Sequence, residues 1–291
     1  MLEESYQAAI SIMKSASKSF YAAFKQLPQE RFYAVAAVYA FCRWADDSVD
    51  EASNDQEAEE NISHLEAYII GENEINEDWQ AAFEDSRRRF QIPNQAFLNQ
   101  CHGQRLDLGF SAMKSREDLI NYCRYVAGSV GEMLGPILIA ENHDNQDPKF
   151  HQAVIDLGIG MQLTNILRDV GEDLAKLNRI YLPKDLLSDY DLDAISLRKM
   201  QNNPKQISSN YQALIEEIMS WSSDYYATIE ENSHYFHPNC RLAVLASARI
   251  YHAIEDEIRQ HGYNNLSRRN YTSKLKRLQI ISQLKSELNE F

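Results

Sequence analysis

The sequence predicts an all-α fold, and three observations support this prediction. Apolar residues recur at the three- and four-residue spacing of helices along almost the whole chain. Only 10 Gly and 7 Pro occur in 291 residues, so turns and strand breakers are scarce. No G-x-G-x-x-G or P-loop pattern is present, which leaves a nucleotide-binding α/β domain without support.

The apolar spacing places the expected helices in order along the chain. Five prolines, at positions 28, 93, 148, 204 and 238, fall just before or inside first helical turns, where proline is tolerated. Ser115 and Asp118 form an expected N-terminal cap. Residues 177–205 are less regular and predict short helices and loops. The expected helices span residues 4–25, 29–52, 55–70, 76–91, 94–112, 116–140, 148–176, 206–232, 238–261 and 271–289.

Composition and charge exclude several classes of protein. No long linker or repeat divides the chain, so residues 1–291 are expected to form one domain. The formal net charge of −14 disfavours a nucleic-acid partner. A phosphate-bearing ligand would need divalent cations or a local cluster of Arg and Lys. The four cysteines are isolated, and neither a signal peptide nor a membrane-spanning run is present, so we expect a cytoplasmic protein that can touch a membrane peripherally.

Two carboxylates follow a strongly apolar segment at residues 32–41. Asp46 and Asp50 are one helical turn apart and share a face, with Arg43 on the neighbouring stripe. Like charges at this spacing repel each other. A divalent cation between them would remove that cost, and Mg²⁺ prefers oxygen ligands.

A second row of oxygens lies on the apolar helix expected at 148–176. Asn165, Asp169 and Asp173 stand four residues apart, and Gln162 lies one turn earlier. Such a row on a largely buried helix is costly unless it is paired or binds metal. The alternative is that each acidic stripe merely faces water, and two such rows together make that alternative much weaker.

The sequence does not match three other known kinds of metal site. An EF-hand loop starting at Asp46 needs Gly where Glu51 stands. A di-iron carboxylate site needs two Glu-x-x-His pairs, and the sequence has one, Glu231 with His234. The zinc hydrolase pattern H-E-x-x-H is absent.

Further polar groups are weaker candidates. Ser17, Lys18 and Ser19 could hold a phosphate through O–H and N–H donors, or could be an ordinary helix surface. The small residues at 127, 128 and 131 predict close helix packing or a kink. The candidate phosphate ligands late in the chain are Arg179, Tyr181, Tyr251, Arg268 and Arg269.

Taken together, these stretches resemble the squalene/phytoene synthase family. The matching segments are SKSFYAAFKQLP, YAFCRWADDSVDE, YCRYVAGSVGEMLGPIL, GMQLTNILRDVGED, RIYLP and ARIY, in the family's order from residue 17 to 251. NILRDVGED and VAGSVGE are most similar to bacterial carotenoid-type members, especially dehydrosqualene synthases. The chain departs from the family at Ala16, where many members carry His.

The resemblance implies a single isoprenoid synthase domain, a helical bundle around a central apolar cavity. It implies that two to three Mg²⁺ ions are held by Asp46, Asp50, Asn165, Asp169 and Asp173. Four of these, Asp46, Asp50, Asp169 and Asp173, would form the catalytic set with Tyr122 and Arg168. The implied diphosphate contacts are Ser17, Lys18, Ser19, Arg43, Gln162, Asn165, Tyr251 and Arg269.

The implied reaction is a Mg²⁺-dependent, head-to-head condensation of two farnesyl diphosphates through a cyclopropyl diphosphate to dehydrosqualene, for carotenoid biosynthesis. Alternatives are a phytoene synthase using geranylgeranyl diphosphate and a squalene synthase using NADPH. No nucleotide fingerprint is present, so NADPH is not expected. A terpene cyclase and a chain-elongating prenyltransferase would use similar helices. A catalytically silent helical assembly protein is the alternative from another class. A monomer and a homodimer are both consistent with the sequence.

Overall fold

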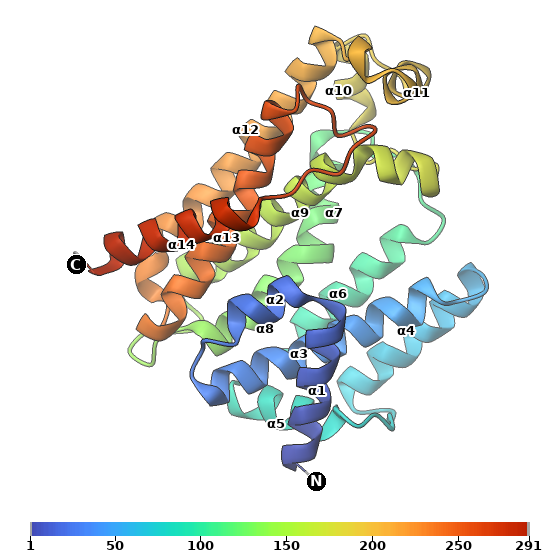
Figure 1. Cartoon of the computed structure of the whole chain (residues 1–291). Helices are drawn as coiled ribbons and strands as arrows, with labels where there is room; N and C mark the ends of the chain where they lie inside the picture. Colours follow the sequence, from blue (N-terminus) through green and yellow to red (C-terminus); the bar gives the residue numbers. More distant parts are fainter. Residues whose placement is uncertain (1, 290–291) are drawn as a thin grey trace.

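Within residues 2–289, which the structure describes apart from the side chains of Lys18, Ser19 and Asn289, the computed structural model contains fourteen α-helices (Figure 1). The helices are α1 (Leu2–Ala16), α2 (Lys18–Phe24), α3 (Gln29–Asp50), α4 (Asp55–Ile70), α5 (Gln80–Arg89), α6 (Asn94–Asp107), α7 (Arg116–Cys123), α8 (Ser129–Leu138), α9 (Pro148–Lys176), α10 (Lys184–Asp189), α11 (Ala194–Asn202), α12 (Ser209–Glu231), α13 (Pro238–Gln260) and α14 (Lys274–Asn289). A π-helix (Arg124–Gly128) joins α7 to α8, and two short 3₁₀ helices lie at Pro204–Gln206 and Ser233–Tyr235.

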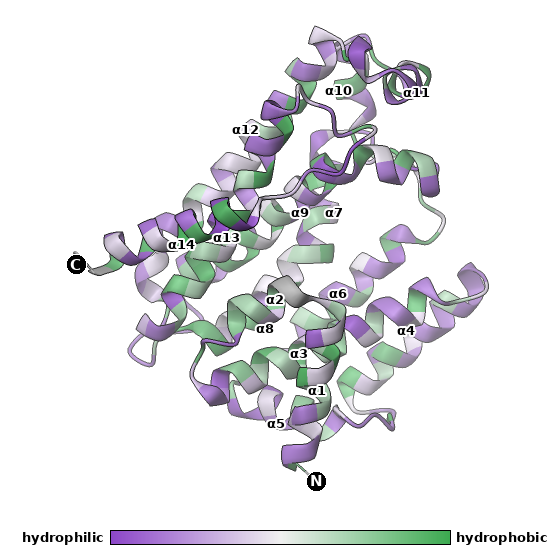
Figure 2. Ribbon diagram, viewed as in Figure 1, coloured by the Kyte–Doolittle hydropathy of each residue, from purple (hydrophilic) through white to green (hydrophobic). Residues whose placement is uncertain are grey.

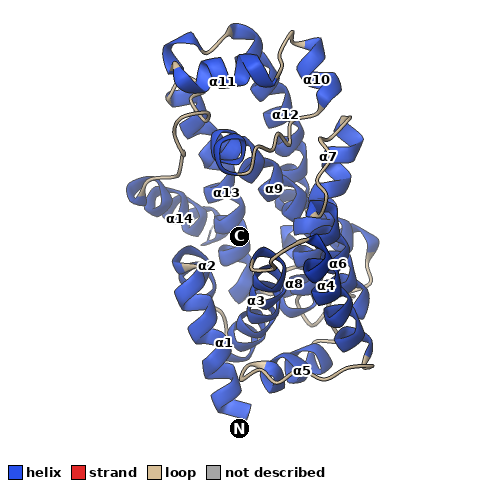
Figure 3. Ribbon diagram, turned by 90° about the vertical axis from the view of Figure 1, so that its right-hand side faces the viewer, coloured by secondary structure: helices blue, strands red, loops and turns tan. Residues whose placement is uncertain are grey.

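This architecture confirms the predicted all-α class. The described residues form no strand beyond an isolated bridge between Ile139 and Phe236, and the ribbon consists of helices joined by loops (Figure 3). The predicted bounds of 55–70 and 148–176 are confirmed at both ends. Ser115 and Asp118 form the predicted capping box. None of the described helices is both long and apolar enough to cross a membrane.

Three predicted helices are corrected. The one expected at 4–25 is interrupted at Ser17, which has extended backbone (φ −142°) and caps α2. The one expected at 94–112 ends at Asp107, because Leu108 is extended and Gly109 adopts a left-handed conformation (φ 58°). The one expected at 116–140 contains the π-turn, so its two halves present different faces.

Small residues in that third helix allow α8 to approach α9 closely. A Cβ on Gly131 would lie 2.0 Å from the backbone oxygen of Val154. A Cβ on Gly158 of α9 would lie 2.3 Å from the oxygen of Ala127. Close helix packing, one of the two interpretations of these small residues, is therefore confirmed.

The apolar core is divided between two main clusters, and α9 contributes to both. One cluster gathers α1, α3, α5, α6 and α8, and the other gathers α7, α9, α10, α11 and α12. Hydrophobic residues concentrate along the inner helices, whereas the connection after α13 is mainly hydrophilic (Figure 2). The four cysteines are free, three of them buried. The helix α8 packs against both α3 and α9, the two helices that carry the predicted oxygen rows.

Candidate active site

The first carboxylate row occupies the last two turns of α3. Asp46 Oδ1 accepts a hydrogen bond from Gln104 Nε2 of α6 at 2.5 Å. Burial, followed by the charge of Asp50, raises the pKa of Asp46 to about 7. The two carboxyl groups are therefore close enough to repel, as their spacing predicts.

Arg43 and Tyr39 lie beside this row. The Arg43 guanidinium donates two hydrogen bonds to the Asp47 carboxylate, one of them from Nε to Oδ2 at 2.9 Å. The positive charge of Arg43 also lowers the pKa of Asp46. Burial raises the pKa of Tyr39, and the nearby Ser17 hydroxyl lowers it to a smaller extent. Ser17 Oγ also accepts from the Phe20 N–H at 3.2 Å, capping α2. The predicted contacts from the side chains of Lys18 and Ser19 lie outside the described residues.

The second row of oxygens follows one side of α9. Asp169 is held by two arginines: Arg168 Nε lies 2.9 Å from Oδ1, and Arg269 Nε lies 3.0 Å from the same atom. Burial, followed by the charges of Asp169 and Glu172, raises the pKa of Asp173 to about 6. Arg168 is also close to Tyr251 of α13, whose hydroxyl helps to raise the pKa of Arg168.

The amide oxygen of Asn165 is the atom of the second row that tests whether the row fits a metal ion. Its Nδ2 donates to Gln162 Oε1 at 3.2 Å, which leaves Oδ1 as the free acceptor. That Oδ1 is buried and has no hydrogen-bond partner. A buried oxygen without a partner is costly, and coordination to a hard cation would remove the cost.

The oxygen atoms of the two rows are therefore of the kind that binds Mg²⁺, although the described residues do not surround a metal position. They contain no group of three or more His, Cys, Asp and Glu side chains placed to hold a metal ion. Arginines instead neutralise Asp169 in the second row, where Arg168 Nη2 lies 2.5 Å from Oδ2 and Arg269 Nε lies 3.0 Å from Oδ1. Carboxylate and amide oxygens remain the ligands that Mg²⁺ prefers.

Asp107, at the C-terminal end of α6, is a half-buried acid that the sequence analysis missed. It accepts hydrogen bonds from Tyr122 Oη at 3.1 Å and Tyr181 Oη at 3.0 Å, and Arg179 Nη1 lies 3.2 Å from Oδ1. Burial raises the pKa of Asp107. Arg179 and Tyr181, which the sequence analysis named as candidate phosphate ligands, both contact Asp107 in this cluster. The Tyr122 hydroxyl also has Asp107 as its hydrogen-bond partner.

Asp107 also links the two rows. The charge of Asp50 contributes to the raised pKa of Asp107, and the charge of Asp107 contributes to that of Asp173. Asp107 therefore lies within electrostatic range of both rows. A weak signal was present in the sequence, because Gln104 and Asp107 stand three apart on α6 and share a face.

Neither of two pockets in the described part of the chain is the expected central cavity. The larger, of about 340 Å³, lies at the N-terminal end of α3 around Arg31 and Arg89, away from the carboxylate rows. A small pocket borders Asp173, Arg179 and Tyr181. The central apolar cavity therefore stays a prediction.

A strap, defined as residues 262–273, joins α13 to α14 and crosses α9 (Figure 1). The Gly171 N–H donates to the Asn265 oxygen at 3.1 Å, and Asn265 Nδ2 donates to the Leu167 oxygen at 2.6 Å. A Cβ on Gly171 would lie only 1.8 Å from the Leu266 oxygen. Gly171 thus lets the strap approach α9 closely, and Arg269 of the strap, rather than Arg268, contacts Asp169.

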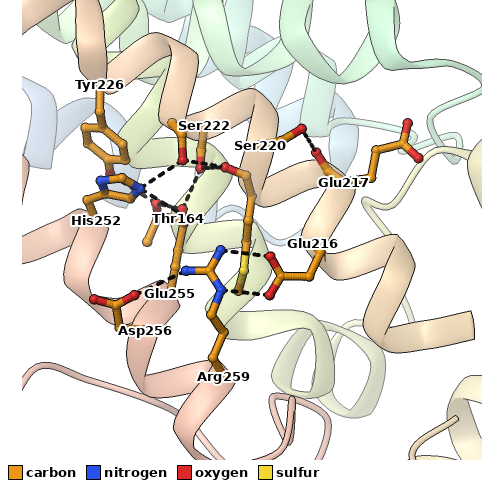
Figure 4. A network of polar contacts seen from close by, with 12 residues as sticks. Thr164, Glu216, Glu217, Ser220, Ser222, Tyr226, His252, Glu255, Asp256 and Arg259 are labelled. Atoms are coloured by element: carbon orange, nitrogen blue, oxygen red, sulfur yellow. Dashed lines mark hydrogen bonds and ion pairs between the residues drawn. The ribbon is translucent and has the colours of Figure 1, made fainter. Parts of the chain in front are cut away.

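Behind the second row, Glu255 of α13 is fully buried in a polar network (Figure 4). Its Oε1 accepts from Thr164 Oγ1 and Ser222 Oγ, each at 2.7 Å. Because Thr164 donates there, its oxygen accepts from Tyr226 Oη at 3.0 Å. Glu255 Oε2 has no hydrogen-bond partner and lies 3.6 Å from His252 Nε2. The network joins α9, α12 and α13.

This network predicts a pH-dependent stability. Burial raises the pKa of Glu255 to about 7, above the value near 4.5 expected when unfolded. A group whose pKa is raised in the folded state contributes stability that is fully present below its unfolded-state pKa. This contribution is lost as pH rises through its folded-state pKa. Between pH 5.5 and 8.5, wild type should lose about 2 kcal/mol of unfolding free energy relative to Glu255→Gln. Urea unfolding at both pH values measures this difference. An equal pH response in the two proteins would contradict the prediction.

Comparison with known proteins identifies relatives along the full chain. A sequence profile described as squalene/phytoene synthase matches residues 13–276. The 4,4'-diapophytoene synthase of Staphylococcus haemolyticus is 32% identical over 99% of this chain and 99% of its own length. The chloroplastic phytoene synthase of Narcissus pseudonarcissus is 31% identical over 97% of this chain, which spans 66% of that longer protein.

A solved structure agrees with these sequence matches. A dehydrosqualene synthase crystallised with a ligand is 32% identical and superposes with a TM-score of 0.86, covering 100% of this chain and 98% of that one. The squalene synthase HpnC from Alicyclobacillus acidocaldarius, at 23% identity and a TM-score of 0.78, has the same fold over 90% of this chain and 96% of its own.

Proposed function

The chain belongs to the squalene/phytoene synthase family, and from that premise we propose that it joins two farnesyl diphosphates head to head into dehydrosqualene. As a family member it is a prenyltransferase of isoprenoid and carotenoid biosynthesis. Similarity to 4,4'-diapophytoene synthase over both full lengths supports the C15 substrate. Residues 1–291 would act as one isoprenoid synthase domain.

The observation that carries the proposal is the buried amide oxygen of Asn165, which has no hydrogen-bond partner and stands in one row with Asp169 and Asp173 on α9. The family uses a divalent metal. In our proposal two to three Mg²⁺ ions are held by Asp46, Asp50, Asn165, Asp169 and Asp173. Bound Mg²⁺ would supply positive charge that neutralises a diphosphate and improves it as a leaving group.

The arginines of the chain have a direct part in binding. Arg168 and Arg269 now neutralise Asp169, and Arg43 neutralises Asp47. Their guanidinium groups suit the oxygens of a diphosphate, which presents the same paired acceptors as a carboxylate. The diphosphate contacts would be completed by Tyr251, Gln162 and the Ser17 hydroxyl.

The remaining chemistry takes place on the substrates. Departure of one diphosphate leaves an allylic cation, which the double bond of the second substrate attacks. Proton loss closes a cyclopropyl diphosphate, and a second ionisation, rearrangement and proton loss gives a linear C30 polyene. No hydride is added, so NADPH is not consumed. The apolar side chains of α3, α8 and α9 would exclude water, which otherwise converts the cation to an alcohol.

Mass analysis of products from farnesyl diphosphate and Mg²⁺ tests the proposal. We expect a C30 dehydrosqualene, unchanged by NADPH. A C30 product reduced to squalene with NADPH, or C15 cyclic products, would replace our assignment. Geranylgeranyl diphosphate must be tested in parallel, because phytoene synthases match this chain at the same level of identity; a preferred C40 product would identify that activity. Absence of diphosphate release with either substrate would indicate a silent assembly protein.

A further inference from the structure

The helix α14 exposes a group of large apolar side chains, which we name the α14 edge and define as Tyr271, Leu275 and Leu278. Their exposed fractions are 67%, 67% and 56%. Seven large hydrophobic residues are exposed in the described part of the chain, and three of them lie within positions 271–278. The opposite side of α14, with Ile281 and Leu284, packs against α13. α14 is therefore apolar on both sides, and the α14 edge, together with the preceding Tyr271, is the side that no other part of the described chain covers.

The same region reverses the charge of the protein. Residues 258–286 contain no Asp or Glu but seven Lys and Arg, in a chain of formal net charge −14. Two of the seven, Arg259 and Arg269, are ion-paired with acids outside this segment. On α14 itself, Lys274 and Lys285 are exposed, and Lys276 and Arg277 are half-buried. Exposed apolar side chains surrounded by cations are suited to the boundary between the anionic headgroups and the acyl chains of a bilayer.

The α14 edge begins beside the candidate active site. Tyr271 follows Arg269 by two residues on the strap, and Arg269 contacts Asp169. Thr272 Oγ1 donates to the Ile250 oxygen at 2.8 Å, and Arg277 Nε donates to the Thr272 oxygen at 2.8 Å. These contacts fix the start of α14 to α13 next to Tyr251. A surface touching the α14 edge would thus lie close to the strap and the second oxygen row.

We propose that the α14 edge docks the protein on a bilayer that contains anionic phospholipid. The apolar side chains enter the boundary between headgroups and acyl chains, and the surrounding cations contact the phosphates. The inference rests on the proposed function, because a substrate with an apolar tail and an uncharged polyene product both partition into membranes. The rest of the acidic surface would be repelled, which orients the molecule with α14 toward the bilayer.

A second copy of the chain fits the α14 edge poorly. A stable interface between proteins buries roughly 800 Å² on each partner, and three side chains do not supply that area. Most homodimers are also two-fold symmetric, so each patch would face its own equivalent. The lysines of α14, Lys274, Lys276 and Lys285, would then lie near the same lysines of the second copy and repel them. An anionic bilayer satisfies both the apolar and the charged side chains.

Vesicle sedimentation with the full chain tests the docking. We expect binding to vesicles of phosphatidylcholine with about 30% phosphatidylglycerol, weak binding to phosphatidylcholine alone, and loss of binding as salt rises from about 0.05 to 0.5 M. Leu275→Ser/Leu278→Ser and Lys274→Glu/Lys276→Glu should each weaken binding at least about tenfold. The matched controls Ile70→Ser/Ile195→Ser and Lys199→Glu/Lys205→Glu replace exposed side chains elsewhere on the chain, and should bind as wild type.

Three results would overturn the proposal: no binding of wild type to the anionic vesicles, equal binding by the α14 variants, or an α14-dependent dimer in light scattering. Turnover of detergent-dispersed farnesyl diphosphate is measured on the same samples. The α14 variants should keep that turnover within about twofold, because they alter no diphosphate or metal contact. If wild type binds vesicles but forms no C30 product, the proposed function fails while the docking stands, so the two failures are distinguishable.

Discussion

Asp46→Asn and Asp169→Asn should each lower kcat by at least about 100- to 1,000-fold at saturating Mg²⁺, with little change in fold. Each substitution keeps the size of the side chain but removes the negative charge. Asp46→Asn keeps an acceptor for Gln104 Nε2, so the α3–α6 contact survives. The loss should therefore fall on metal binding and leaving-group stabilisation, and steady-state kinetics over a range of Mg²⁺ concentrations would measure it.

Asp156→Asn provides the matched control for Asp169→Asn. Asp156 lies on the same helix, is buried, and accepts a hydrogen bond from Gln152 Nε2 at 2.7 Å, but it is outside both oxygen rows. We expect this variant to keep near-wild-type kcat. Near-normal rates for Asp46→Asn or Asp169→Asn would refute their assignment as metal ligands.

Gly171→Ala should damage stability and activity together. Alanine ordinarily stabilises a helix relative to glycine by about 1 kcal/mol. Here the added Cβ would lie 1.8 Å from the Leu266 oxygen, a backbone atom that cannot rotate away. The strap must shift, which breaks the Asn265 contacts and withdraws Arg269 from Asp169. We expect a loss of at least about 2 kcal/mol in urea unfolding and at least about tenfold in kcat/KM.

Two companion variants locate the cause. Gly160→Ala, on the same helix, places its Cβ 3.3 Å from the nearest atom, the Tyr225 Cβ, and should change stability by no more than about 1 kcal/mol. Arg269→Ala should lower activity without a comparable loss of stability, because the Arg269 side chain is largely exposed. Wild-type stability in Gly171→Ala would show that the strap does not depend on this crossing.

Helix positions were predictable from the sequence because apolar periodicity and proline placement are local signals. The helices α4 and α9 begin and end where their patterns predict. The errors are at Ser17, at Asp107 and in the π-turn after Cys123, where a cap, a left-handed glycine or a close helix contact overrides the apolar pattern. Such features depend on backbone geometry that the spacing of apolar residues does not encode.

The oxygen rows were also predictable, because residues four apart on one helix share a face in any helical fold. Which groups meet across helices was not. Asp107 follows an unremarkable stretch of α6 and becomes notable only beside Tyr122, Tyr181 and Arg179. The choice between Arg268 and Arg269 likewise depended on where the strap crosses Gly171.

The sequence alone determines the helical class, the two oxygen rows and the family resemblance. Each depends on short patterns of residues that are neighbours along the chain. Folding adds the contacts of Asp107 with Tyr122, Tyr181 and Arg179, the unpartnered Oδ1 of Asn165 and the exposure of the α14 edge. These features escape local patterns because burial and charge coupling depend on distances between segments up to a hundred residues apart, and packing sets those distances.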